Sequence, residues 1–327
     1  MIITKTPFRM SFVGGGSDLE SYYGNKVGAV VSTTIDKYVF ITLNKNFDKG
    51  INLKYSQVEK VENISDLQHD RAREVLKMLK ITDSLEISSL ADIPSKGTGL
   101  GSSSSFTVGL LQALHAYKGE YASPEKLAQE ACQIEIDILG EPIGKQDQYA
   151  AAYGGLNLIQ FNPDGSVAVD PIICKKDTIQ ELESNILMFY TGITRSASNI
   201  LADQKKNLEA DKNKALVMDK MVKLAFDLKN ELQENNVSAF GEILNENWNL
   251  KKQMASGVST PAIDDWYDLA MKAGATGGKL LGAGGGGFLM FYAPKDKHVQ
   301  VRQSLNMLRP IDLKFDYQGS KVIFIHD

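Results

Sequence analysis

The chain has 327 residues, of which 43% are hydrophobic and 23% charged, values typical of a globular protein with one large domain or two. The formal net charge is −4 and no long basic stripe is present, so nucleic acid is not an expected partner. No signal-peptide core and no run of 18 apolar residues occurs, so no membrane partner is expected. The only two cysteines, Cys132 and Cys174, predict a reducing, cytoplasmic compartment.

The N-terminal segment predicts strands at 2–4, 9–13, 29–36 and 37–43. Pro7 lacks a backbone N–H, which predicts a bend or a sheet edge between the first two strands. A glycine turn, Gly14–Gly16, comes before a short helix, for which Ser17 or Asp18 is the expected N-cap. An amphipathic helix at 70–80 then leads to a strand at 85–93.

The most informative stretch is 94–105, which reads PSKGTGLGSSSS and joins the 85–93 strand to a helix expected at 102–117. Its alternating glycines can take a positive φ and come close to a ligand. Ser102 or Ser103 is expected to cap the helix, whose free first-turn N–H groups attract anions. An ordinary capped turn needs only one glycine and one serine, so the sequence favours a phosphate-binding loop.

The middle of the chain predicts a helix at 124–139, a helix starting near 148 that Gly154 ends, and a hairpin around 162–165. The polar stretch 175–184 suggests a boundary between a domain at 1–180 and a domain at 181–327. The second part predicts a strand at 185–192 and a long helical region at 198–255, broken near Asp211 and Asn235.

The C-terminal region predicts a helix at 261–273, capped by Thr260 with Pro261 in its first position. Two strands flank a third glycine tract at 282–287, and a helix at 297–308 comes before strands near 313–315 and 321–325. The expected fold class is therefore α+β, in two halves.

Three glycine tracts in separate positions suggest backbones that converge on one polyanionic ligand. The common nucleotide-binding patterns do not fit them. The third glycine of a dinucleotide-binding GxGxxG motif would fall on Ser102, no glycine loop ends in Gly-Lys-Ser/Thr, and the HRD and DFG elements of protein kinases are missing. Metal hydrolase and serine hydrolase chemistry is also disfavoured, because the four histidines are scattered and no GxSxG motif occurs.

Three further residues suit phosphoryl transfer, although each has an ordinary alternative. Asp147 comes just before a helix, where an N-cap is as good an interpretation as a catalytic carboxylate. Glu135 lies on an apolar-periodic helix, where a glutamate normally faces solvent rather than a metal. Arg9 follows a strand pattern beside a glycine turn and, taken alone, would be a surface cation.

Taken together, these features resemble a known family. PFRMSFVGGGSD, PSKGTGLGSSSS and KLLGAGGGGF look like the three ordered motifs of the GHMP small-molecule kinases, and the resemblance covers nearly the whole chain. Within that superfamily, the first motif and GKQDQYAAAYGG look most like the bacterial D-glycero-D-manno-heptose 7-phosphate kinases, with L-fucokinase domains as close relatives.

The resemblance implies an N-terminal domain like domain 2 of ribosomal protein S5, a ferredoxin-like C-terminal domain, and a site between them that binds ATP and Mg²⁺. Asp147 would orient or deprotonate the acceptor hydroxyl, with Arg9 holding it ionised, and Ser103 and Glu135 would hold the metal. The residues implied in ATP binding are Lys96, Gly97, Gly99, Leu100, Gly101, Ser102, Ser103 and Ser104.

One departure from the family concerns the acceptor. Galactokinases carry Glu and His where this chain has Gly15 and Gly16, whereas the sugar-binding carboxylate is kept as Asp18. The lost contacts and the added volume argue against galactose and favour a larger sugar. A phosphate on that sugar needs a cation, for which Arg195 is the first candidate and Lys145 the second. The other residues expected at the substrate are Ser17, Gly284 and Gly285.

The sequence therefore predicts an ATP- and Mg²⁺-dependent kinase that phosphorylates the anomeric hydroxyl of D-glycero-D-manno-heptose 7-phosphate, giving the 1,7-bisphosphate for nucleotide-activated heptose. A kinase for another sugar such as L-fucose is one alternative. A catalytically silent relative that senses sugar and ATP is the other, although Asp147, Arg9, Glu135 and Ser103 are all retained. The sequence leaves the oligomeric state open, a homodimer included.

Overall fold

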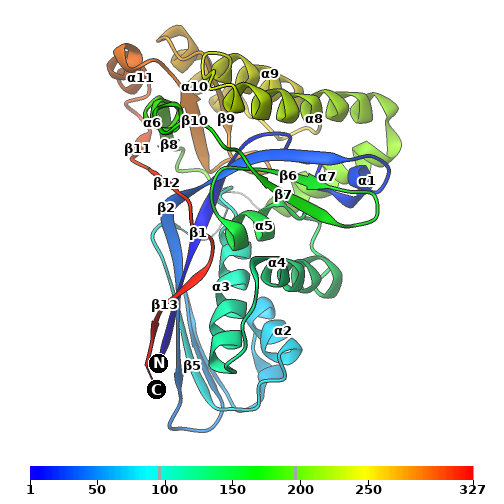
Figure 1. The fold of residues 1–327 in the computed structure, drawn as a ribbon, viewed down its shortest axis with the longest axis vertical. Coiled ribbons are helices and arrows are strands. Elements are labelled where there is room, and N and C mark those ends of the chain that lie inside the picture. Colours follow the sequence, from blue (N-terminus) through cyan, green and yellow to red (C-terminus); the bar gives the residue numbers. More distant parts are fainter. Residues whose placement is uncertain (95–96, 195–196, 327) are drawn as a thin grey trace.

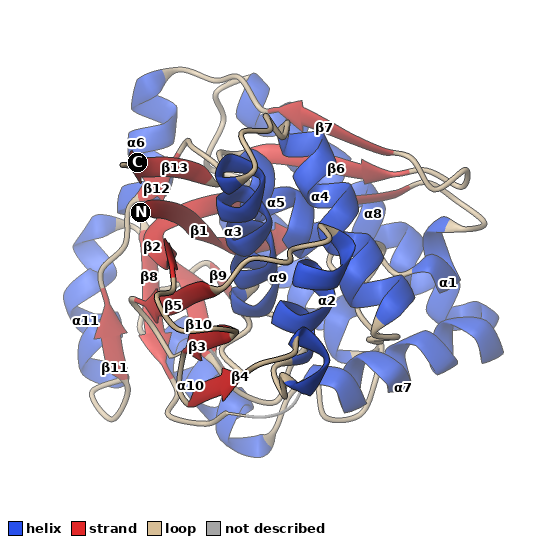
Figure 2. Ribbon diagram, turned by 90° about the horizontal axis from the view of Figure 1, so that it is seen from below, coloured by secondary structure: helices blue, strands red, loops and turns tan. Residues whose placement is uncertain are grey.

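The computed structural model describes residues 1–94, 97–194 and 197–326. Two sheets organise the fold, and most of the helices pack against one or the other (Figures 1 and 2). None of the helices in these described ranges is long and apolar enough to cross a membrane.

The first sheet has nine strands and is built around two long antiparallel strands, β1 (Ile2–Val13) and β2 (Gly28–Lys45). Its main path runs β13-β1-β2-β5-β3-β4, while β12 and β6 also pair with β2, and β7 pairs with β6. The remaining strands of this sheet are β3 (Ile51–Lys54), β4 (Val58–Val61), β5 (Leu85–Ala91), β6 (Asn157–Phe161), β7 (Val167–Pro171), β12 (Phe315–Asp316) and β13 (Lys321–Ile325).

The sequence predicted that Pro7 would separate two strands, and this is wrong. β1 runs through it, and its register against β2 shifts between Pro7 and Phe8. A register shift of this kind is where a sheet tolerates a missing N–H donor. The other neighbour of β1 is β13, which pairs only with the segment Ile2–Lys5 and therefore ends before Pro7.

Helix α3 (Ser102–Tyr117) packs on β1 and β2, with α2 (Asp70–Met78), α4 (Pro124–Cys132) and α5 (Gln146–Tyr153) beside it (Figure 1). Apart from Ser103, every residue of α3 from Ser102 to Leu111 is buried, which explains its continuous apolar and small-residue sequence. The expected helix at 124–139 is confirmed in extent, but Gln133–Ile138 is wound as a π-helix. π-helical turns often occur at functional sites, and this one carries Glu135.

The second sheet is antiparallel, in the order β11-β8-β10-β9, and lies with most of the later helices at the top of Figure 1. Trp248 of α9 packs in its core with side chains of β8 and β10. The breaks predicted near Asp211 and Asn235 are confirmed, since α8 begins at Lys212 and ends at Gln233. The elements are β8 (Ile186–Tyr190), β9 (Gly277–Leu280), β10 (Phe288–Tyr292), β11 (Arg309–Ile311), α6 (Lys176–Ser184), α7 (Ala197–Ala210), α8 (Lys212–Gln233), α9 (Phe240–Lys252), α10 (Pro261–Lys272) and α11 (His298–Ser304).

The predicted division at residue 180 needs one correction at the C-terminus. β12 pairs with β2 and β13 pairs with β1, so the last strands return to the first sheet (Figure 1). The polar stretch that suggested a boundary forms the helix α6. The segment from α6 to β11, called the second body below, is therefore an insertion between two parts of the first sheet. Residues 181–327 do not form one contiguous domain.

Candidate active site

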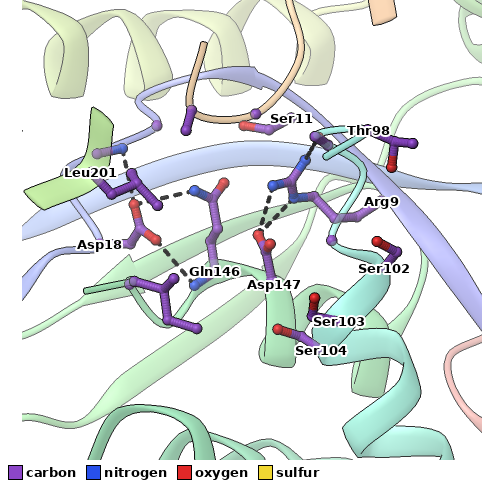
Figure 3. Close-up of a pocket in the computed structure, with 18 of the residues that line it drawn as sticks. Arg9, Ser11, Asp18, Thr98, Ser102, Ser103, Ser104, Gln146, Asp147 and Leu201 are labelled. Carbon is purple, nitrogen blue, oxygen red and sulfur yellow. Dashed lines mark hydrogen bonds and ion pairs between the residues drawn. The ribbon is translucent and has the colours of Figure 1, made fainter. Parts of the chain in front are cut away.

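A cavity of about 500 Å³ lies where the three glycine tracts meet (Figure 3). Gly15 and Gly16 line it from the first tract, Gly97, Gly99 and Gly101 from the second, and Gly282 from the third. The predicted convergence of the three backbones is therefore confirmed. The other lining residues used below are Arg9, Ser11, Asp18, Arg71, Ser102, Ser103, Ser104, Glu141, Gln146, Asp147, Leu201, Asn247, Lys251 and Lys279.

Glycine is required where the second and third tracts touch. A Cβ on Gly99 would lie 2.2 Å from the carbonyl oxygen of Leu281, and one on Gly282 would lie 2.4 Å from the Cα of Gly99. Their φ values are +73° and +84°, a region that side chains rarely adopt. The loop before α3 is thus pressed against a loop that follows β9 of the second sheet, and together they close one side of the cavity.

Gly101 brings the start of α3 into contact with two charged side chains. It has a φ of +74°, and a Cβ there would lie 3.3 Å from Oδ2 of Asp147 and 3.2 Å from Cγ of Arg9. Gly101 is also the N-cap of α3, so the expectation that Ser102 or Ser103 caps the helix is wrong. Instead, the serines of the first turn line the cavity, where a helix N-terminus favours a phosphate.

Arg9 and Asp147 form a close ion pair at the centre of the cavity. Nε and Nη2 of Arg9 lie 2.8 and 2.7 Å from the same oxygen, Oδ1 of Asp147, and Nη1 donates to the carbonyl of Gly99 at 2.7 Å. Asp147 is the second residue of α5 and does not cap it. Figure 3 shows Asp147 between the serines of α3 on one side and Gln146 and Asp18 on the other.

Asp18 is buried at the far side of the cavity from the serines. Its carboxylate accepts hydrogen bonds from the backbone N–H of Gly16 at 2.9 Å and from the side chain of Gln146 at 3.2 Å. Burial, followed by the negative charge of Asp147, raises the pKa of Asp18. Neither Asp18 nor Ser17 caps a helix as predicted, because α1 (Glu20–Tyr23) begins after Leu19 and Ser17 bonds to the backbone of Ala29.

Two buried lysines that the sequence analysis did not single out also line this cavity. Lys251 of α9 donates to the carbonyl of Gly15 and to Oε1 of Gln204, both at 2.9 Å. Lys279 of β9 donates to the carbonyls of Ser11 and Phe12, both at 2.9 Å. Burial lowers the pKa of Lys251 to about 8, against an opposing contribution from Asp18, and lowers the pKa of Lys279 well below its usual value.

Three buried polar atoms of the cavity wall have no hydrogen-bond partner among the described residues. They are Ser11 Oγ, Gln146 Oε1 and Asn247 Nδ2. A buried polar group without a partner is costly, and a ligand rich in hydroxyl groups would satisfy all three. This part of the cavity wall therefore suits a ligand that carries several hydroxyl groups.

Glu135 lies behind the cavity wall and is fully buried. Its two oxygens accept four hydrogen bonds between 2.6 and 3.1 Å, which fill the acceptor capacity of the carboxylate. The donors are Arg71, Ser104, Thr107 and Gln148. Arg71 also pairs with Glu141, which keeps the guanidinium in place.

This arrangement does not fit direct Mg²⁺ binding by Glu135, because Arg71 supplies the positive charge at its carboxylate. The serine that contacts Glu135 is Ser104, at 2.7 Å, whereas Ser103 is exposed in the cavity. Within the described part of the chain, no group of three or more potential metal-binding side chains is found. The predicted Ser103–Glu135 metal site therefore stays a prediction without geometric support here.

A second cavity, of about 650 Å³, adjoins the first and shares Arg71, Ser102 and Ser103 with it. Its wall includes His69 and Phe106, whose rings lie 4.7 Å apart, and Tyr55, whose ring is 4.8 Å from that of His69. Burial lowers the pKa of His69, which favours the neutral ring. An aromatic wall beside a helix N-terminus, which favours a phosphate, suits a nucleotide base.

Several predicted site residues do not line the first cavity. The ammonium of Lys145 donates to the carbonyl of Gly165 and lies over the ring of Tyr23. Leu100 acts through its backbone carbonyl, which accepts from Arg9 N–H. Gly284 and Gly285 pack against the backbone of Val258. Lys96 and Arg195 lie outside the described residues.

Comparison with known proteins agrees with this geometry. Residues 69–155 match the family model of the GHMP kinases N-terminal domain, and residues 228–306 match that of the GHMP kinases C-terminal domain. The chain is 32% identical over 338 residues, 98% of each protein, to the D-glycero-alpha-D-manno-heptose 7-phosphate kinase of Campylobacter jejuni. It is also 32% identical over 223 residues to the L-fucokinase/L-fucose-1-P guanylyltransferase of Bacteroides fragilis, covering 67% of this chain and 23% of that protein.

Solved structures give the same result. The crystal structure of a D-glycero-D-manno-heptose 1-phosphate kinase from Bacteroides thetaiotaomicron superimposes with a TM-score of 0.81 at 27% identity, covering 100% of both chains. The two-domain GHMP kinase fold is therefore confirmed. With matches to both family models and a full-length relative, the chain belongs to the GHMP kinases, and it is a sugar kinase similar to proteins named as heptose phosphate kinases.

Proposed function

We propose that this protein transfers the γ-phosphate of ATP to the anomeric hydroxyl of D-glycero-D-manno-heptose 7-phosphate. The observation that carries the proposal is the position of Asp147, between the phosphate-binding end of α3 and the polar pocket around Asp18 (Figure 3). A carboxylate in this position can accept a hydrogen bond from an acceptor hydroxyl while a nucleotide phosphate occupies the helix N-terminus.

The nucleotide occupies both cavities in this proposal. Its base lies in the aromatic cavity beside His69 and Phe106, and its phosphates lie at the shared serines, Ser102 and Ser103. The N-terminus of α3 stabilises negative charge there. GHMP kinases use ATP as the phosphate donor. Mg²⁺ that accompanies the nucleotide would add positive charge, but direct ligation by Glu135 would first require Arg71 to leave.

The acceptor lies on the other side of Asp147. Because Arg9 occupies Oδ1, Oδ2 is left to accept the hydrogen bond of the anomeric hydroxyl. As that oxygen bonds to the γ-phosphorus and the bond to ADP breaks, its proton passes to Asp147. Arg9 stabilises the charge of the site during the transfer.

The choice of acceptor follows from the remaining wall of the cavity. A Cβ on Gly15 would meet nothing closer than Ser11 Oγ at 3.7 Å, so this glycine leaves room for a substituent larger than galactose carries. Asp18, Ser11, Gln146 and Asn247 offer donors and acceptors to its hydroxyls. One of the two relatives above is named as a heptose 7-phosphate kinase and the other as a heptose 1-phosphate kinase, so both names support an acceptor of the size of a heptose.

The test is an ADP-release assay with a panel of D-glycero-D-manno-heptose 7-phosphate, free heptose, galactose, L-fucose and mevalonate. We expect the highest kcat/KM with the heptose 7-phosphate. Turnover of L-fucose or a free hexose, with none of the heptose phosphate, would reject the substrate assignment and keep the kinase. No turnover of any sugar, with ATP still bound, would favour a sensing relative.

A further inference from the structure

The proposed substrate carries a phosphate at the end remote from the reacting hydroxyl, and a buried cation, Lys251, lines the cavity. Lys251 of α9 contacts the first glycine tract through Gly15, and Asp18 contacts it through the N–H of Gly16. A Cβ on Gly16 would lie 3.2 Å from the ammonium of Lys251. The lysine is therefore on the Asp18 side of Asp147, the side on which the proposed function places the sugar.

The ammonium of Lys251 makes two hydrogen bonds to the described residues, which leaves one of its N–H donors for a ligand. Its two acceptors, a carbonyl and an amide oxygen, carry no net charge, and an ammonium group has three N–H donors. Lys251 is 6% exposed, so water contributes little. A buried ammonium with neutral partners and a remaining donor is a favourable site for an anion.

A second donor lies one helical turn away on the same face of α9. Asn247 is fully buried, its Oδ1 accepts from the backbone N–H of Gly14 at 3.1 Å, and its Nδ2 has no partner among the described residues. The bond from Gly14 fixes the orientation of the amide, so Nδ2 is the atom left for a ligand. Residues four apart project from the same side of a helix, and both of these line the cavity.

We infer that Asn247 and Lys251 bind the phosphate of the sugar substrate and so select a phosphorylated over an unphosphorylated acceptor. This inference rests on the proposed function and adds the residues that read the substrate's charge. It replaces Lys145, whose ammonium is held by Gly165 and Tyr23. Leu201 of α7 lies beside Asp18 in Figure 3, so the second body closes the same end of the cavity.

The experiment compares kcat/KM for D-glycero-D-manno-heptose 7-phosphate with that for unphosphorylated heptose. In Lys251→Met we expect the ratio of the two to fall by about 10- to 100-fold, the size of a lost charge-assisted hydrogen bond. Lys252→Met is the matched control, because Lys252 is the next residue, is partly exposed and pairs with Asp264. We expect no change in the ratio for that variant.

Asn247→Asp provides a second variant of nearly the same shape. It keeps the acceptor for Gly14 N–H but places a carboxylate oxygen where Nδ2 would meet the phosphate, so the ratio should again fall. The KM for ATP should stay unchanged in both variants. If it rises while the sugar ratio is constant, these residues serve the nucleotide and the inference is wrong.

The outcomes separate the two proposals. If the wild-type protein does not phosphorylate heptose 7-phosphate, the proposed function fails. If the wild type does so and both variants lose equal activity with the two sugars, the function stands and the phosphate assignment is overturned. If Lys251→Met does not fold, as judged by its thermal unfolding, Asn247→Asp alone decides between these results.

Discussion

Arg9 directs two nitrogens at one oxygen of Asp147, Oδ1, at 2.8 and 2.7 Å. The arginine is almost fully buried, whereas the aspartate side chain keeps 25% of its surface exposed toward the cavity. This asymmetry turns Asp147 so that one oxygen is anchored and the other is available to the acceptor.

The first prediction concerns Asp147 itself. Asp147→Asn keeps the shape of the side chain but cannot accept the proton, so kcat should fall by about 10²- to 10⁴-fold. Binding of the sugar phosphate, measured by calorimetry without nucleotide, should change little. A variant that retains wild-type kcat would show that the carboxylate is not needed, although the kinase assignment would survive.

The second prediction uses two glycines that flank α3. Gly101 and Gly119 have φ values of +74° and +70°, but a Cβ at Gly101 would crowd Arg9 and Asp147, whereas one at Gly119 meets nothing within 4 Å. Alanine at either site should cost about 1–2 kcal/mol in the free energy of unfolding, because the left-handed conformation is strained. Only Gly101→Ala should also lower kcat, by at least about tenfold, since it displaces the ion pair. Equal kcat in the two variants would contradict this account of the loop.

The third prediction separates a structural from a metal-binding role of Glu135. Glu135→Gln removes one charged partner from the half-buried guanidinium of Arg71, which keeps Glu141, so it should lower the free energy of unfolding by roughly 1–3 kcal/mol. Asp137→Asn, two residues further on and exposed, is the control and should unfold like the wild type. Chemical denaturation without nucleotide or Mg²⁺ measures both. Unchanged stability of Glu135→Gln, with a large rise in the Mg²⁺ concentration needed for activity, would favour the metal site instead.

The fourth prediction is a pH dependence of sugar-phosphate binding. Burial lowers the pKa of Lys251 to about 8, so its ammonium is charged below that pH and neutral above it. The charged groups that act on it are Asp18, which raises its pKa, and Arg9, which lowers it. Affinity for the phosphorylated sugar should therefore fall as the pH rises above about 8, with a smaller fall for the unphosphorylated sugar. In Lys251→Arg the fall should disappear, because arginine stays protonated. Parallel pH profiles for both sugars would argue against Lys251 as the phosphate ligand.

Much of the fold was predictable because its signals are local. Thr260 and Pro261 mark the start of α10, where the threonine side chain accepts from Ile263 N–H. The paired-strand pattern around residues 162–165 forms β6 and β7. The course of the last strands was not predictable, because the pairing of β13 with β1 joins segments more than 300 residues apart along the chain. Neither segment alone indicates that β13 is the strand that pairs with β1.

The candidate site was predictable only in part, for a similar reason. The glycine tracts and Asp147 carry motifs, whereas Lys251 and Lys279 look like ordinary lysines of a helix and a strand until the second body packs against the first. Asn247 and Lys251 are spaced four apart on one helical face, the one local signal that could have pointed to them. The partner of Arg71 was also hidden, since Glu135 lies 64 residues away along the chain.

The central claim is that the protein transfers phosphate from ATP to the anomeric hydroxyl of D-glycero-D-manno-heptose 7-phosphate. Phosphorus NMR of that sugar phosphate with ATP and the wild-type protein tests it most directly. The account predicts equal formation of ADP and of a second, anomeric phosphate signal, absent with Asp147→Asn. Unchanged heptose 7-phosphate, in a preparation that consumes ATP with a free hexose or L-fucose, would contradict it.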